Sequence, residues 1–318
     1  MRLFESLAHP RALLIACLVS LPGCAQVLDI PDDPELVPEE SGGPWGCLNR
    51  PNTPPGAPQA DTALVRVQAC NFVSNNCSEP ATGITARLCD KKDVMCLTPI
   101  GPPIPDVGGA LVFQVPTGGS LGAGFEGYLQ VAPPLELCTN QSVFGPAWSS
   151  LCALATAQNG CDVSDPDDRC KLPTFGPSLL FFNPPIKADV TTPIPLPLIP
   201  TAQVPNLIQA GGGNFDPSTG VLFITAVDCN GVPAPGVTFQ IDRHRDIATP
   251  MYLDNGVVSN AATQTDASGS GGFIGVPAGF ATIAGEVEIQ PGVKVRVGEL
   301  GVQSAPFTIT KATLAPTG

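Results

Sequence analysis

The sequence predicts an all-β protein with two antiparallel β-sandwich modules in tandem. The first observation is composition: the 318 residues include 34 Gly and 37 Pro, which disfavours long helices and favours short strands joined by turns. The second is a series of apolar, β-branched runs, such as residues 221–227 and 236–241, bounded by Asn-Gly, Pro and Gly turn signals. Only 14% of the residues are charged, so enough apolar residues remain to build a core.

The third observation is an internal repeat. Three segments of the first half have counterparts in the second half in the same order: 83–88 with 236–239, 111–118 with 272–279, and 127–131 with 285–289. Matched strands in one order are typical of a duplicated module. We therefore expect Val115 and Val276 at equivalent strand ends, and we expect each module to fold by itself.

The remaining segments connect or decorate these modules. An insertion at 138–171 breaks the strand pattern of the first module, and a short helix is expected within it after Pro146. The predicted organisation is a first module at 62–190, a Pro-rich connector at 191–213 with one helical segment at 204–210, and a second module at 214–318.

The N-terminus has the features of an export signal. Arg2 and Arg11 accompany an apolar run at 12–21 that is too short to span a bilayer, so residues 1–23 are predicted to be a signal peptide. The run ends in Leu21-Pro22-Gly23-Cys24, which resembles the bacterial lipobox. That resemblance implies cleavage before Cys24 and a diacylglycerol on its thiol, whereas the alternative is an ordinary signal peptide with a chance cysteine.

The residues after Cys24 bear on location. Ala25 replaces the Asp that retains such lipoproteins at the inner membrane of enteric bacteria, so the resemblance implies a lipid anchor in the outer membrane, facing the periplasm or the cell surface. Residues 24–61 are acidic and rich in Pro, and they show no apolar periodicity, which predicts an extended tether.

The second module also resembles a known family. It contains the turn Asp228-Cys229-Asn230-Gly231-Val232-Pro233, the turn beginning Thr265-Asp266, and a strand ending in Val276-Pro277-Ala278-Gly279. Over most of residues 220–291 this pattern resembles the carboxypeptidase regulatory-like domain, a transthyretin-like β-sandwich. The first module resembles it more loosely, through Gly83 and residues 115–118. The whole arrangement resembles surface lipoproteins of myxobacteria. The resemblance to the carboxypeptidase regulatory-like family implies a structural or binding role without catalytic residues.

Cysteine usage indicates an oxidising compartment. Of the 12 cysteines, removal of Cys17 with the signal peptide and lipidation of Cys24 leave ten, an even number. Short spacings predict three bridges: Cys70–Cys77, Cys89–Cys96 and Cys161–Cys170. The pairing of Cys47, Cys138, Cys152 and Cys229 stays open.

Several patterns resemble sites for chemistry. Ser120 lies in a G-x-S-x-G pattern but lacks a following helix, and the mature chain has a single histidine, His244, so a serine hydrolase is a remote alternative. Residues 122–127 fit G-x-G-x-x-G, but the segment that follows reads as a strand, so a dinucleotide site is not expected. A weak candidate for calcium is the acidic loop with Asp162, Asp165, Asp167 and Asp168.

These observations favour a non-catalytic, membrane-anchored lipoprotein that displays two β-sandwich modules for adhesion, envelope structure or protein binding. A glycan- or calcium-binding module is the alternative, with Tyr128, Tyr252 and the two tryptophans as the aromatic candidates. No cofactor is expected. The net charge of −13 disfavours nucleic acid as a partner, which leaves the membrane, through Cys24, and an unidentified protein or envelope component.

The lipobox resemblance generates the first testable prediction. Labelled palmitate should enter the protein, and Cys24→Ala should yield an unprocessed or soluble form, because acyl chains contribute about 0.8 kcal/mol of membrane affinity per buried CH₂. Membrane fractionation with metabolic labelling measures both effects. Unchanged processing and fractionation of the Cys24→Ala variant would contradict the prediction.

Overall fold

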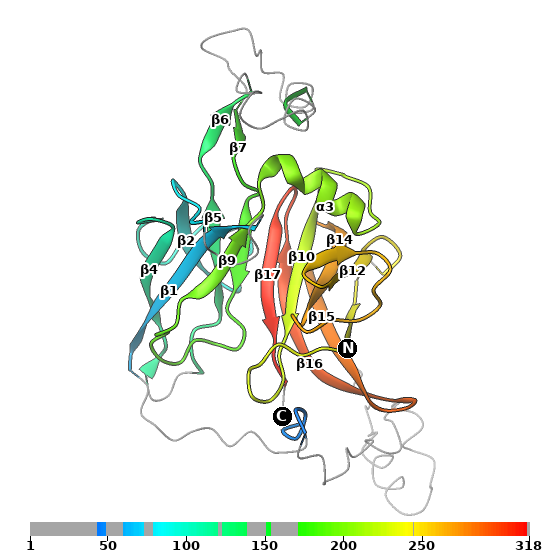
Figure 1. The fold of residues 1–318 in the computed structure, drawn as a ribbon. Helices are drawn as coiled ribbons and strands as arrows, with labels where there is room; N and C mark the ends of the chain where they lie inside the picture. Colours follow the sequence, from blue (N-terminus) through cyan, green and yellow to red (C-terminus); the bar gives the residue numbers. More distant parts are fainter. Residues whose placement is uncertain are drawn as a thin grey trace, which may run out of the picture. The chain divides into compact units, whose positions relative to one another are not determined.

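The computed structural model of the chain describes residues 43–48, 60–72, 79–119, 123–138, 151–153, 171–243 and 245–316. The chain divides into two units, 1–39 and 40–318, and all described residues lie in the second. Their structure is mostly β, in several sheets, with little helix (Figure 1).

The strands of the first half are β1 (Thr62–Asn71), β2 (Thr85–Asp90), β3 (Ile104–Pro105), β4 (Ala110–Pro116), β5 (Gly127–Ala132), β6 (Leu135–Leu137), β7 (Lys171–Pro173), β8 (Ser178–Phe181) and β9 (Ile194–Leu198). Two short helices follow, η4 (Thr201–Gln203) and α3 (Val204–Ala210). The second half contains β10 (Thr219–Ala226), β11 (Val237–Ile241), β12 (Thr249–Asp254), β13 (Val257–Ser259), β14 (Ser270–Pro277), β15 (Gly279–Gln290), β16 (Val293–Ser304) and β17 (Ile309–Leu314).

A first sandwich is formed by two layers with a buried core between them. One layer is the sheet β4-β1-β9, and the other is the β8-β5-β2-β3 portion of a nine-stranded sheet. Alternate residues of each strand point inward, as the period of two requires. The inward set includes Val65 and Val67 of β1, Leu129 and Val131 of β5, and Leu196 of β9, all at most 1% exposed.

A second sandwich uses the other portion of the same nine-stranded sheet. Its layers are β13-β12-β14-β10-β17 and the separate sheet β11-β15-β16. Leu222, Ile224 and Ala226 of β10 share one face and are fully buried, as the alternation of the sequence predicts. Phe239 and Ile241 of β11 meet them from the opposite layer.

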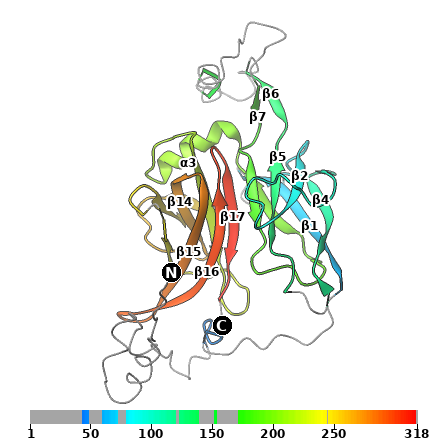
Figure 2. The same cartoon turned by 180° about the vertical axis from the view of Figure 1, so that it is seen from behind.

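The two sandwiches are joined by a parallel pairing of β8 with β17, in which Leu179 lies opposite Thr310 and Leu180 opposite Lys311. The nine-stranded sheet therefore runs through both sandwiches, with β17 between β10 and β8. Figure 1 shows β17 beside β10, and Figure 2 shows β17 between the other strands of the second half and those of the first. Leu180 faces the first core, whereas Leu179 and Phe181 belong to the second. The outer layers of the two sandwiches consequently lie on opposite faces of one sheet.

The two halves have matching strand topology. In the first, β1 pairs antiparallel with β4 and parallel with β9; in the second, β10 pairs antiparallel with β14 and parallel with β17. Thr62 lies opposite Pro116, and Thr219 lies opposite Pro277. The prediction that the two Val-Pro-x-Gly stretches end equivalent strands is confirmed.

Two expectations differ from the structure. The sandwiches are not purely antiparallel, because the pairs β1–β9, β10–β17 and β17–β8 are parallel. In addition, the expected connector at 191–213 supplies β9 as well as the expected helix, α3. Pro195 and Pro197 are compatible with β9 because this strand lies at a sheet edge, where a missing N–H leaves no ladder bond unmade.

The turns of the second sandwich show why its sequence pattern contains Asp and Gly. The Asp228 carboxylate accepts the N–H groups of Asn230 at 2.8 Å and Val232 at 3.0 Å, and these bonds lower its pKa. Asp266 likewise accepts the N–H of Ser268 at 2.9 Å. Gly269 has φ +65°, and a Cβ there would lie 2.4 Å from the carbonyl oxygen of Ala226, so only glycine fits.

Disulfides tie distant parts of the chain together. Cys47 is bonded to Cys229, 182 residues away, and the backbone N–H of Cys229 donates to the carbonyl of Pro44 at 3.0 Å. Cys138 is bonded to Cys152, which is one of the helical residues 151–153 within the expected insertion. Spacing alone left both pairings open, because neither loop is short.

The packing of Phe239 generates a stability prediction. This ring is 6% exposed and stacks on Tyr252, with centroids 5.9 Å apart and planes 11° from parallel. Phe239→Ala should lower the free energy of unfolding by about 3–5 kcal/mol, because it removes buried apolar surface and leaves a cavity. Gln240→Ala, on the exposed face of the same strand, should change it by less than about 0.5 kcal/mol. Chemical denaturation measures both, and equal effects would contradict the core assignment.

Candidate binding groove

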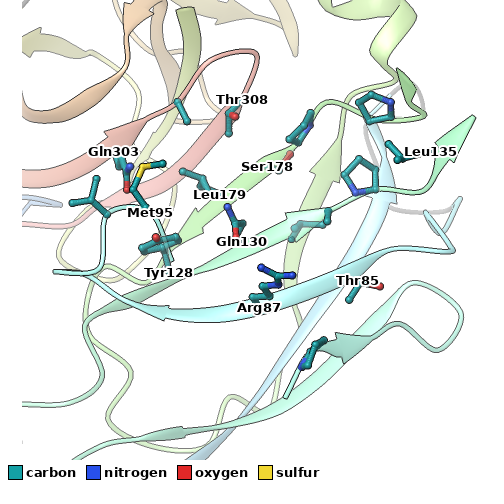
Figure 3. Close-up of a pocket in the computed structure, with 18 residues that line it drawn as sticks. Thr85, Arg87, Met95, Tyr128, Gln130, Leu135, Ser178, Leu179, Gln303 and Thr308 are labelled. Atoms are coloured by element: carbon teal, nitrogen blue, oxygen red, sulfur yellow. The ribbon is translucent and has the colours of Figure 1, made fainter. Parts of the chain in front are cut away.

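A groove of about 580 Å³ lies on the outer face of the first sandwich, where the nine-stranded sheet is not covered by the layer of the second (Figure 3). Its floor is a transverse row of paired residues, Arg87 of β2, Gln130 of β5 and Leu179 of β8. The residues that line the groove are Thr85, Arg87, Val94, Met95, Pro103, Tyr128, Gln130, Val131, Ala132, Pro133, Leu135, Pro173, Pro177, Ser178, Leu179, Gln303, Ala305 and Thr308.

The strand period explains this face. In β2, Ala86 and Leu88 point into the first core, which turns Thr85 and Arg87 outward. The same alternation in β5 buries Leu129 and presents Gln130. The layer β11-β15-β16 packs over β8 and contributes Gln303, at the end of β16, to one side of the groove. The groove therefore lies at the border of the layer β11-β15-β16, where the nine-stranded sheet becomes uncovered.

A second side of the groove is a short loop closed by a disulfide. Cys89 and Cys96, one of the expected pairs, are bridged in the structure across seven positions of sequence. Closing a loop of this size stabilises by roughly 2–3 kcal/mol in the chain-entropy account. The loop holds Val94 and Met95 over the floor with 40% and 69% of their surfaces exposed.

Asp93 organises this loop from within. Its carboxylate accepts the N–H of Leu97 at 2.9 Å, the N–H of Thr98 at 2.7 Å and the Thr98 hydroxyl at 2.9 Å. These bonds favour the ionised form, and the pKa of Asp93 lies below its usual value of 3.8. The loop backbone is thus held by a charged acceptor as well as by the bridge.

Tyr128 connects the loop to the floor. Its hydroxyl donates to the backbone carbonyl of Asp93 at 2.6 Å, and its ring stacks on Phe181 with centroids 5.0 Å apart. Burial, together with the negative charge of Asp93, raises the pKa of Tyr128 to about 12. The phenol therefore stays protonated and keeps donating to the loop throughout the physiological range.

The far end of the groove is formed by the hairpin of β6 and β7. Leu135, at the start of β6, is 61% exposed and lines the groove together with Pro173 of β7. This hairpin projects from the sheets in Figure 1. The groove thus has large exposed apolar side chains at two of its sides, Met95 on the loop and Leu135 on the hairpin.

Arg87 is the charged side chain of this lining. It is exposed, and neither of the two ion pairs within the described residues involves it, since these join Lys91 to Glu126 and Arg296 to Glu299. Its partner across the strand pair is the neutral Gln130. The groove therefore combines apolar walls with one cation that has no carboxylate counterpart in the described part of the chain.

Most sites proposed from the sequence lie outside the described residues: Cys24, Ser120, His244, Cys77, Cys161, Cys170, Asp162, Asp165, Asp167 and Asp168. Cys70 is disulfide-bonded. Of the aromatic residues considered for sugar stacking, Tyr128 and Tyr252 are buried, at 1% and 4% exposure, so their rings are not platforms. The groove escaped sequence reasoning, although the outward positions of Thr85 and Arg87 follow from strand alternation.

Two further results concern membranes and metals. No helix in the described ranges is long and apolar enough to cross a bilayer. Among the same residues, no group of three or more His, Cys, Asp or Glu side chains is placed to hold a metal ion.

Comparisons with known proteins give no match in sequence and only weak superpositions in structure. No known protein family matches the sequence, and no curated protein matches it. A Streptococcal ancillary pilin superposes on 80% of this chain and 68% of its own with 12% identity and a TM-score of 0.20. The shaft pilin SpaA from Lactobacillus rhamnosus GG superposes on 81% of this chain and 98% of its own, with 12% identity and the same TM-score of 0.20. Superpositions with a TM-score of 0.20 do not establish a common fold.

The bonds of Asp93 generate a pH prediction. A carboxylate whose folded pKa is depressed contributes stability that is present above its unfolded pKa and is lost as the pH falls through the folded value. The amide signals of Leu97 and Thr98 in ¹H–¹⁵N NMR spectra should therefore titrate together with a midpoint below 3.8. Asp93→Asn should abolish this shared titration. A midpoint at or above 3.8 would show that the carboxylate does not hold the loop.

Proposed function

We propose that the chain is a non-catalytic, membrane-anchored lipoprotein that binds an extended, apolar segment of a partner protein in the groove, with Arg87 pairing a carboxylate of that segment. The lipid on Cys24 would anchor it in the outer membrane, and the two sandwiches would be carboxypeptidase regulatory-like modules on a tether. The observation that supports a binding role is the groove itself, which combines exposed apolar walls with a cation that has no described counterpart.

The apolar walls favour a binding surface over an ordinary solvated face. Isolated apolar residues on a surface are normal, but Met95, Val94 and Leu135 gather around one concavity. The groove volume of about 580 Å³ lies in the range of pockets that enclose several side chains or a small ligand. Bound apolar side chains would be removed from water there at roughly 25 cal/mol per Å² of buried surface.

Charge selects the kind of segment. The net charge of −13 repels a strongly acidic partner at long range, so the partner as a whole is expected to be neutral or basic. Within the groove, however, Arg87 offers a planar fork of donors that matches a carboxylate in two parallel hydrogen bonds. One Asp, Glu or terminal carboxylate within an otherwise apolar segment satisfies both conditions.

The anchor would leave the groove free to reach a partner. Residues 24–61 span at most roughly 130 Å if fully extended, at about 3.3–3.6 Å per residue. A domain on such a tether is restricted to a shell near the membrane, which raises the effective concentration of partners held at the same surface.

The groove proposal is tested with phage-displayed random peptides selected against the purified full chain. Selected peptides should be rich in apolar residues and carry one Asp, Glu or free C-terminal carboxylate. Arg87→Glu should weaken their binding by more than about tenfold in calorimetry, because it replaces attraction with repulsion at the floor.

The matched control is Arg66→Glu, which makes the same charge change at an exposed position of β1 outside the groove. It should change Kd by less than about twofold, as expected of a charge remote from the contact. Failure to select any peptide, or equal weakening by the two variants, would overturn the proposal.

A further inference from the structure

A second site lies on the opposite face of the nine-stranded sheet and is built around Lys311. This residue belongs to β17, where it lies between Phe223 of β10 and Leu180 of β8. Paired residues of parallel strands share a face, so the Lys311 side chain points away from the groove, toward the layer β4-β1-β9. Lys311 is half-buried at the centre of the sheet that joins the two sandwiches.

The amine of Lys311 is held at one point. Its Nζ donates a hydrogen bond to the backbone carbonyl of Pro197 in β9. This bond joins β17 of the second sandwich to β9, which is an edge strand of the first sandwich. One of the three donors of an ammonium group is thereby used.

A cavity of about 320 Å³ is lined by Lys311 and by Pro197, whose carbonyl accepts the hydrogen bond of the amine. Its walls are largely apolar and include Phe72, Phe223, Ile194 and Leu253, with Phe72 and Phe223 in ring contact at 6.2 Å between centroids. The only polar side chains among the described lining residues, apart from Lys311, are hydroxyls such as those of Thr225 and Ser270.

The cavity supplies no counter-ion. No Asp, Glu, His or Arg is found among its described lining residues, which come from β8, β9, β10, β12, β14 and β17 and from the loops beside them. Asp266 is the carboxylate beside the lining residues Ser268 and Gly256, but it is not itself a lining residue. Its carboxylate accepts the backbone N–H groups of Ser268 and Gly256. Burial without a carboxylate partner disfavours the ammonium form, and it lowers the pKa of Lys311 to about 7.

We propose that Lys311 is a nucleophilic lysine and that its cavity takes a small apolar aldehyde, preferably aromatic, as an imine. The neutral Nζ attacks the carbonyl carbon, and a proton moves from nitrogen to the former carbonyl oxygen to give a carbinolamine. Loss of water then forms the C=N bond, so the step needs no oxidant, reductant or further reactant. The rings of Phe72 and Phe223 would contact the apolar body of the aldehyde.

An aldehyde fits this site better than an apolar carboxylate does. A carboxylate requires the ammonium form and adds a second buried charge, which must itself be desolvated. An aldehyde is neutral, reacts with the form of the amine that the cavity favours, and loses its polar oxygen as water. This inference does not depend on the proposed function, because the groove and the cavity lie on opposite faces of the sheet and share no lining residue.

The experiment treats the full chain with benzaldehyde and sodium cyanoborohydride, which reduces an imine to a stable benzyl amine that peptide mass spectrometry locates. At pH 7 Lys311 should be labelled more than about tenfold faster than the exposed Lys187, because about half of the Lys311 amines are neutral at that pH and the cavity can hold the aldehyde beside them. Its labelling rate should level off above a midpoint at pH about 7.

Two controls separate this site from general amine chemistry. Unfolding in urea should remove the preference for Lys311, because the cavity is lost. Lys187→Arg should leave labelling at Lys311 unchanged, whereas Lys311→Met should remove the fast phase. Because the comparison of Lys311 with Lys187 is made within one wild-type molecule, it decides the question even if Lys311→Met fails to fold. Equal rates at the two lysines, or a preference that persists in urea, would overturn the proposal.

Discussion

The parallel pairing of β8 with β17 is the contact on which the rest of the structure depends. In this pairing β8 belongs to the first sandwich's portion of the nine-stranded sheet and β17 to the second's. Three residue pairs join the two strands, from Ile309 opposite Ser178 to Lys311 opposite Leu180. Without this pairing there would be two separate sheets, each with an open edge. With it, one continuous sheet carries the layer β4-β1-β9 on one face and the layer β11-β15-β16 on the other. The groove and the Lys311 cavity both follow, because each lies where one outer layer ends on that sheet.

Much of the local structure could be predicted because it depends on neighbours in sequence. The run at 219–226 alternates strongly enough to place Leu222 and Ile224 on one buried face, and the Asp-x-x-Gly turns bring their own hydrogen bonds. The helix α3 at 204–210 begins with Pro at its second position and is followed by glycines, which are start and stop signals in the sequence itself. The loop closed by Cys89 and Cys96 is short enough for spacing to suggest the bridge.

Other features could not be predicted because they depend on partners remote in sequence. The strand β9 contains Pro195 and Pro197, and only its edge position, set by tertiary structure, makes them acceptable. The join at β8 and β17 pairs segments about 130 residues apart, and no local pattern specifies it. The hairpin of β12 and β13 is a different case: Asn255-Gly256, both with positive φ, is a strong turn signal between two strands that sequence reasoning passed over. The outward position of Arg87 follows from strand alternation, but whether that face is covered depends on where the second layer ends.

The disulfide between Cys47 and Cys229 has a mechanical consequence. If the N-terminus is held at a membrane, tension along the chain reaches Cys47 and passes through the bridge into the turn between β10 and β11 of the second sandwich. The covalent bond therefore bypasses residues 48–61, and β1 is not pulled from its end. A load applied at the groove would then cross from one sandwich to the other through the strands of the shared sheet. That load would be carried by the hydrogen bonds of one short parallel pair, Ser178–Leu180 of β8 with Ile309–Lys311 of β17.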